Sequence, residues 1–308
     1  MFPIIPANSA ASFQKNTEGI FGFGTTGSYT AVSNLVSNVG VVADDVTGVG
    51  TGRRYIAACE YGGDKGIFGY GQYRDSPTSI TRTAVSNLVS NAGVVATDTT
   101  GVGTAREGLA ACSYGGDKGI FGYGDTDGDY GHTSVTNLVS NAGVVSTDGT
   151  GVGTARSHLA ACEYGDDKGI FGYGYDGGWT SNVSMTNLVS NAGVVGTDVT
   201  GVGTARCYPG ACEYGGDKGI FGFGHDGSSY VGMTNLVSNA GVVATDVTAV
   251  GTDRGGLGAC EYGGDKGIFG YGYYTLSMTN LVSNAGVVAT DVTGVGTARY
   301  GLAACSFN

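Results

Sequence analysis

Short apolar runs separated by glycine and polar turns recur along the whole chain. A complete repeat unit holds "LAACSY" (109–114), "KGIFGYG" (118–124), "TNLVSN" (136–141) and "GVVSTD" (143–148). β-Branched residues and glycines stand where a helix needs Ala, Leu or Glu. Asn-x-Gly between the last two runs is a hairpin signal, because Asn and Gly accept a positive φ. Each unit therefore predicts four short antiparallel strands and no helix.

The unit recurs six times at a period near 50 residues. The motif GIFG begins at Gly19, Gly66, Gly119, Gly169, Gly219 and Gly267, with spacings of 47, 53, 50, 50 and 48 residues. A β-rich period of this length is typical of propeller blades. The chain enters at a second strand (17–24) and stops after a lone first strand (298–308). Joining these ends completes one blade, so we predict an all-β, closed six-bladed β-propeller of four-stranded blades.

The predicted boundaries separate an N-terminal arm, residues 1–15, from a propeller at 16–308. The expected blades are 299–308 plus 16–50, 53–103, 106–153, 156–203, 206–251 and 254–296. In the arm, Phe2, Ile4 and Ile5 form an apolar strip that suits docking on a partner. A tag-like disordered end and a cover for the base of the propeller are the alternatives.

Glycine accounts for 60 of the 308 residues, and much of it falls inside predicted strands. In "KGIFGYG" the strand alternation puts Phe68 and Tyr70 on one face, and Ile67, Gly69 and Gly71 on the other. Blades stack face to face, so an aromatic face needs a recess on the adjoining blade. We expect the glycines to form these recesses, because they let another group approach the backbone closely.

The order of these segments resembles a kelch-type repeat. In residues 104–141 an Arg precedes a first strand of small residues, a turn follows, and a glycine-rich second strand leads to a third. The resemblance covers nearly the whole chain and implies propeller architecture closed by a C-terminal first strand. Two features depart from it: the diglycine becomes Gly-x-Gly, and the Trp of the fourth strand is missing. "LAAC…GIFGYG" also resembles repeats of the regulator-of-chromosome-condensation type, and the near-identical units resemble arrays in bacteriophage and environmental viral proteins.

The net charge and the distribution of apolar residues narrow the classes of partner that can be expected. The formal net charge is −11 and the pI about 4.5, so the surface repels nucleic acid and anionic membranes, and neither is expected as a partner. The start has no basic residue before a long apolar run, and no apolar stretch approaches about 20 residues. We therefore expect a chain made without export. With the resemblance to viral repeat arrays, this implies a virion protein made in the host cytoplasm, or otherwise a cytoplasmic one.

Several repeated residues suggest chemistry, but packing explains them better. Six cysteines share one position: Cys59, Cys112, Cys162, Cys212, Cys260 and Cys305. A thiol ring binding a soft metal is the alternative to buried packing, yet Cys-x-x-Cys pairs are missing and only three His are present. The repeated Arg and Asp, once per unit, are expected as ion pairs or loop anchors. No cofactor or metal is expected.

Two sets of acidic residues leave cation binding open as an alternative. Glu60, Glu163, Glu213 and Glu261 recur at one position and can ring one end of the channel, where they would attract a cation. Asp125, Asp127 and Asp129 alternate as in a calcium loop, but the Gly and the later bidentate Glu of that motif are missing. An acidic surface loop is the favoured interpretation for these three aspartates.

The repeat units differ most between their second and third strands. These segments are residues 25–31, 72–84, 125–135, 175–185, 225–233 and 273–278. All must emerge on one face of the ring. Variable aromatic and polar loops on a rigid scaffold are a common design for recognition. The expected ligand-binding residues are Tyr29, Tyr73, Arg74, Asp127, Asp129, Tyr130, His132, Trp179, His225, Tyr230, Tyr273 and Tyr274.

The sequence thus favours a non-catalytic structural or recognition module. His132, His158 and His225 have no recurring Ser or Asp partner for a triad. We expect a phage virion component, such as a tail, fibre-associated or capsid-decorating protein. Its partners would be other virion or scaffold proteins, or a cell-surface glycan. A stand-alone carbohydrate-binding lectin and an enzyme using the axial channel are the alternatives.

Overall fold

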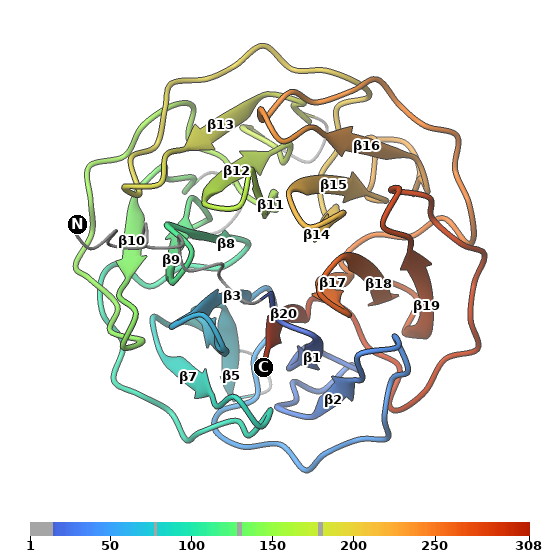
Figure 1. Ribbon diagram of the computed structural model, residues 1–308. Coiled ribbons are helices and arrows are strands. Elements are labelled where there is room, and N and C mark those ends of the chain that lie inside the picture. The colour runs from blue at the N-terminus through green and yellow to red at the C-terminus, as the bar shows by residue number, and fades with distance from the viewer. Residues whose placement is uncertain (1–14, 77–78, 128–130, 178–180) are drawn as a thin grey trace, which may run out of the picture.

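Strands and turns make up the chain in the computed structural model, which describes residues 15–76, 79–127, 131–177 and 181–308. Over these ranges no helix occurs, and hence none that is long and apolar enough to cross a membrane. The strands form six three-stranded antiparallel sheets and one two-stranded hairpin. Figure 1 shows the six sheets arranged around a common centre, a propeller-like layout in which long connections follow the rim.

Each three-stranded sheet has an inner, a middle and an outer strand. The inner strands are β3 (Ala57–Tyr61), β8 (Ala110–Tyr114), β11 (Ala160–Tyr164), β14 (Gly210–Tyr214), β17 (Gly258–Tyr262) and β20 (Ala303–Phe307). The middle strands are β1 (Glu18–Gly22), β4 (Lys65–Gly69), β9 (Lys118–Gly122), β12 (Lys168–Gly172), β15 (Lys218–Gly222) and β18 (Lys266–Gly272). The outer strands are β2 (Ser33–Val36), β7 (Ser86–Val89), β10 (Thr136–Val139), β13 (Thr186–Val189), β16 (Thr234–Val237) and β19 (Leu276–Val282). The hairpin of β5 (Gln72–Ser76) and β6 (Ser79–Arg82) projects from the second unit.

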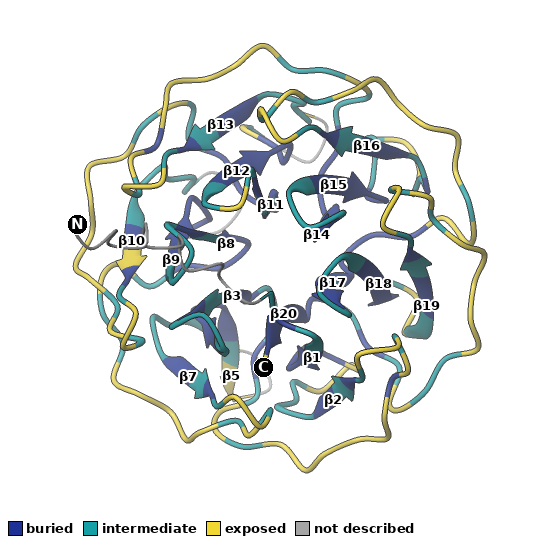
Figure 2. Cartoon of the chain, in the orientation of Figure 1, coloured by how far each residue is buried: buried dark blue, intermediate teal, exposed yellow. Residues whose placement is uncertain are grey.

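The two ends of the chain meet in one sheet. Strand β1 pairs with β2 on one side and with the C-terminal β20 on the other, with Ile20 opposite Cys305. Each inner strand contacts the inner strand of the next unit, and β20 contacts β3. Figure 2 shows buried residues gathered in these sheets and exposed ones along the rim. The prediction that the C-terminal strand completes the first unit is confirmed.

The prediction of a continuous fourth strand in each unit is wrong. In the fourth unit only two isolated bridges join the outer segment to β13, Val189 with Val195 and Thr186 with Val199. Between them the buried Asn187 side chain donates to the Gly196 carbonyl at 3.0 Å and to Asp198 Oδ1 at 2.9 Å. The side chain thus adds to a few backbone bonds, such as that from Gly196 N–H to the Leu188 carbonyl at 2.8 Å, which together keep the segment attached without making it a strand.

The glycines of the middle strands form the expected recesses. A Cβ at Gly122 would lie 2.8 Å from Cζ of Phe171 in the next unit. The predicted shared face of Phe68 and Tyr70 is wrong, however. Phe68 packs on Phe23 of the preceding unit, whereas Tyr70 packs on Phe121 of the following one. Tyr70 has a φ of 64°, and this left-handed residue ends the alternation of β4.

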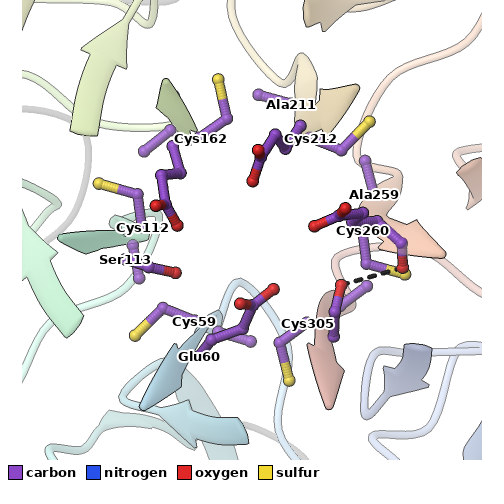
Figure 3. Close-up of a pocket in the computed structure, with 18 residues that line it drawn as sticks. Cys59, Glu60, Cys112, Ser113, Cys162, Ala211, Cys212, Ala259, Cys260 and Cys305 are labelled. Carbon is purple, nitrogen blue, oxygen red and sulfur yellow. Dashed lines mark hydrogen bonds between the residues drawn. The ribbon is translucent and has the colours of Figure 1, made fainter. Parts of the chain in front are cut away.

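The six equivalent cysteines pack between sheets. A Cβ at Gly119 would lie 2.5 Å from Sγ of Cys59, and the other five cysteines meet an equivalent glycine in the same way. Figure 3 shows the labelled thiols turned away from the central channel. Burial raises the pKa of the Cys59 thiol, so it stays protonated. These thiols fill interfaces and do not form a ring of ligands on the axis.

The repeated arginines anchor the sheets to one another. Arg106 is fully buried and lies 4.3 Å above the ring of Tyr70 in the preceding unit. It donates to the Tyr123 carbonyl at 2.7 Å, the Thr104 carbonyl at 3.0 Å and Asn137 Oδ1 at 2.8 Å. The repeated aspartates fasten the rim. Asp148, for example, accepts hydrogen bonds from the backbone and hydroxyl groups of Thr104. Both sets are loop anchors.

Candidate functional site

The second residue after each repeated Arg takes part in a ring of six backbone hydrogen bonds. The donor and acceptor pairs are Tyr55 to Gly301, Gly301 to Gly256, Gly256 to Tyr208, Tyr208 to His158, His158 to Gly108 and Gly108 to Tyr55, at 2.6 to 3.0 Å. All six residues are left-handed, with φ from 51° to 64°. Each bond joins neighbouring repeat units, and the sixth returns to the first residue.

Three of these six positions carry aromatic side chains although the backbone there favours glycine. The ring centroids of Tyr55 and His158 are 4.9 Å apart, and those of His158 and Tyr208 are 4.3 Å apart. Tyr55 and Tyr208 come from units on opposite sides of the ring and still lie within 6.0 Å. The three side chains thus meet across the centre of the ring. We call them the aromatic plug.

A cavity of about 350 Å³ lies beside the aromatic plug. All three plug residues and Tyr175 line it with aromatic faces, and His158 stacks on Tyr175 at 5.3 Å. Its polar wall consists of Arg54, Gln72, Arg82, Glu107 and Asp125. Apolar faces joined to a few converging polar groups are typical of small-molecule sites of this size.

Charged groups in the cavity wall are paired with one another. Arg82 Nη2 lies 2.7 Å from Glu107 Oε1 and 3.7 Å from Asp125 Oδ1. Burial raises the pKa of Glu107, and the nearby Arg82 and Arg54 partly offset this. Burial also lowers the pKa of His158 to about 3, with His132 and the two arginines adding to the effect. His158 is therefore neutral.

Four cavity residues have a buried polar atom without a hydrogen-bond partner. These atoms are Arg54 Nε, Arg82 Nε, Glu107 Oε2 and His158 Nε2. Buried polar groups are usually satisfied, so each such atom needs an explanation. Here both donors and acceptors are left over around a single cavity. A ligand with hydroxyl groups can satisfy both kinds, because a hydroxyl donates and accepts.

The structure brings some of the predicted loop residues into a continuous aromatic layer around this site. Tyr273 shares a 2.6 Å hydrogen bond with Tyr55, and its ring lies 5.5 Å from that of Tyr230. Tyr230 contacts His225 at 5.0 Å, and His132 contacts Tyr175 at 5.2 Å.

The remaining predicted residues lie further out. Tyr29 accepts a hydrogen bond from Gln72 at 3.1 Å and holds Arg54 over its ring. Arg74, Asp127 and Tyr274 are exposed, with the Tyr274 ring 5.4 Å from that of Tyr230, and Tyr73 is half-buried. Asp129, Tyr130 and Trp179, and the arm residues Phe2, Ile4 and Ile5, lie outside the described residues.

Sequence reasoning missed the centre of the site. Arg54, Tyr55, Glu107, His158 and Tyr208 come from the two positions after the repeated Arg, not from the variable loops. These positions also differ between units, being Arg-Tyr, Glu-Gly, Ser-His, Cys-Tyr, Gly-Gly and Tyr-Gly. This second variable segment was the available signal. Arg82 and Tyr175 do lie in the variable loops, but nothing in the sequence sets them apart.

The aspartates of the calcium-like loop have other roles in the structure. Asp125 is buried, accepts from the Asp127 backbone at 3.0 Å and lies 3.6 Å from His132 Nδ1. Its neighbour Arg82 already supplies a positive charge, while Asp127 is exposed. Within the described ranges, no three His, Cys, Asp or Glu side chains gather closely enough to hold a metal ion.

Comparison with known proteins finds neither a family model nor a curated protein that matches this chain.

His158 gives the plug a specific pH dependence. Its folded pKa of about 3 lies below the ordinary 6.5, so the unfolded chain takes up the proton first as the pH falls. The stabilisation is complete above pH 6.5 and is lost progressively towards pH 3. Between about pH 7 and pH 5 we expect the wild type to lose roughly 2 kcal/mol relative to His158→Tyr.

Tyrosine is the matched replacement because it stands at two equivalent positions, Tyr55 and Tyr208. Denaturant midpoints of both chains at the two pH values measure the effect, and all other titrating groups cancel in the difference. Parallel pH profiles for the two chains would contradict a buried neutral imidazole.

Proposed function

We propose that this chain is a closed six-bladed β-propeller that works as a non-catalytic recognition module, with the plug cavity as its binding site. The propeller assignment is supported by the ring of six hydrogen bonds between successive units and by the contacts of each inner strand with the next. The pairing of β1 with β20 supplies the remaining link between the chain ends. A closed ring leaves no exposed inner edge, which suits a rigid scaffold for binding.

The ligand class proposed is a carbohydrate, bound as part of a glycan. The observation that carries this is the set of unpartnered buried donors and acceptors on the wall of an aromatic-lined cavity. A sugar ring offers C–H groups to the aromatic wall at the half-buried Tyr55, and its hydroxyls suit Arg82, Glu107 and Arg54. Tyrosines add contact area at low cost in conformational entropy. A role as a virion component remains a proposal based on the repeat resemblance.

The hairpin of β5 and β6 provides a matched pair of variants for the test. Arg82 lines the cavity, whereas Arg74 is exposed on the same hairpin. We expect Arg82→Gln to weaken glycan binding at least tenfold, the loss of about one charged hydrogen bond. Arg74→Gln is expected to change it less than twofold. The measurement is a glycan array followed by titration calorimetry on the tightest hit.

Two outcomes would contradict the proposal. Loss of binding in Arg74→Gln with none in Arg82→Gln would place the ligand on the outer loops instead of in the cavity. Absence of glycan binding by a folded wild type, in the array and to bacterial cell surfaces, would remove the carbohydrate assignment.

A further inference from the structure

The six inner strands surround a central channel. A second cavity lies near the end of this channel where the inner strands have their carboxyl-terminal residues. Axis-facing residues alternate along these strands, so a layer of six alanines is followed by a layer with four glutamates and two serines. A cavity of about 50 Å³ lies between these layers. Figure 3 shows the Glu60 carboxylate pointing into this central space. The channel end is therefore apolar on one side and acidic on the other.

Lys15 already places an ammonium group at this acidic end. Its Nζ donates to Glu213 Oε1 at 2.7 Å, and the next residue, Asn16, donates to Glu60 Oε2 at 2.9 Å. Burial lowers the pKa of Lys15, but Glu213, Glu163 and Glu261 outweigh this effect and raise it. One ammonium group thus faces four glutamate side chains, so burial, together with mutual repulsion at all but Glu60, raises the pKa values of these glutamates.

Two buried acceptor atoms at this end of the channel have no hydrogen-bond donor. Glu261 is 3% exposed and its Oε1 has no hydrogen-bond partner. Asn16 is also 3% exposed, and its Oδ1 has none either. Burial and the neighbouring glutamates raise the pKa of Glu261 well above its usual range. An additional ammonium group would supply the missing donor to Glu261 and favour its ionised form.

The spacing of the carboxylates selects the kind of cation. No three acidic side chains in the described part of the chain converge closely enough for a single metal ion. An ammonium group is different, because its three N–H donors reach separate acceptors. A short alkyl chain behind it would take the place of the Lys15 stem, in the cavity that Tyr61, Gly63 and Gly116 also line. Lys15 has this chemistry, a primary ammonium on an aliphatic stem.

We propose that the acidic end of the axial channel is a binding site for primary alkylammonium groups, with Lys15 as its built-in occupant. The site is separate from the plug cavity and does not depend on the carbohydrate proposal. An added amine competes with Lys15 in the wild type, and it takes the vacated place when the lysine is shortened. Because Lys15 is tethered, its effective concentration is on the order of millimolar, which weakens outside amines in the wild type.

Amine rescue of Lys15→Ala tests the proposal. At about pH 8, above the pKa of about 7 that Glu213 has beside Lys15, n-butylammonium chloride is titrated into the folded variant and followed by thermal melting and calorimetry. We expect saturable stabilisation of Lys15→Ala, with affinity at least tenfold above that of the wild type. Tetramethylammonium chloride at equal concentration is the control for ionic strength, since it has the charge but no N–H donor.

Further variants make the test decisive. Adding Glu261→Gln to Lys15→Ala should weaken the amine at least fivefold, and Lys15→Met, which keeps the aliphatic stem, should respond as Lys15→Ala does. Equal effects of the two ammonium salts would overturn the proposal, because they would mean charge screening only. Equal amine affinity in wild type and Lys15→Ala would also overturn it, since the amine would then bind elsewhere.

Discussion

Arg106→Met is expected to destabilise the folded chain by about 4 kcal/mol, since it leaves three acceptors without a donor in a buried interface. These are the carbonyls of Tyr123 and Thr104 and the side chain of Asn137. The stacking of the guanidinium on Tyr70 is lost as well. Guanidinium denaturation followed by circular dichroism measures the change through the midpoint and slope.

Two other arginines are expected to give smaller losses of stability and serve as comparisons. Arg156 donates to the carbonyls of Tyr173 and Thr154, but its Nη2 has no partner, so Arg156→Met should cost about 1 kcal/mol less. Arg74→Met, at an exposed site, should change stability by less than about 0.5 kcal/mol. Equal midpoints for Arg106→Met and Arg74→Met would show that the buried guanidinium is not an anchor.

Gly66→Ala is expected to cost about 3 kcal/mol through overpacking between two sheets. The new Cβ would lie close to Cys305 Sγ, and Gly66 is not left-handed, so the effect is steric. Cys305→Ala alone should cost about 1 to 2 kcal/mol by leaving a small void. In the double variant the alanine methyl takes the place of the sulfur. We therefore expect a coupling of at least about 1 kcal/mol in a double-mutant cycle.

The equivalent pair in the next unit is a built-in comparison. At Gly119 a Cβ would meet Cys59 Sγ and also the Glu60 carbonyl oxygen at 3.0 Å, whereas the atoms nearest to the Gly66 position are all side-chain atoms. Gly119→Ala should therefore be rescued less by Cys59→Ala than Gly66→Ala is by Cys305→Ala. Additive costs in both pairs would mean that the glycines are not recesses for the thiols.

Only part of the candidate site could be predicted from the sequence. The variable loops indicated where the aromatic side chains gather, and Tyr230, Tyr273 and His132 do lie in or beside the aromatic layer. The plug residues His158 and Tyr208 were not predicted, because in sequence they look like ordinary variation after an arginine. Their importance comes from a left-handed backbone that turns side chains from three different units towards one another.

The sequence by itself determined the all-β composition of the fold, the six repeats, the joining of the chain ends in one sheet and the use of glycine as a recess. These follow from local periodicity, because alternation along a strand decides which residues face a neighbouring sheet. Only the tertiary structure decided that Tyr70 turns to the opposite side from Phe68, and that an asparagine side chain helps to hold a fourth segment that forms only isolated bridges. It also decided which charges meet in the cavity and at Lys15. Such contacts join segments that are far apart in the chain, and periodicity carries no information about the angles at which the sheets come together.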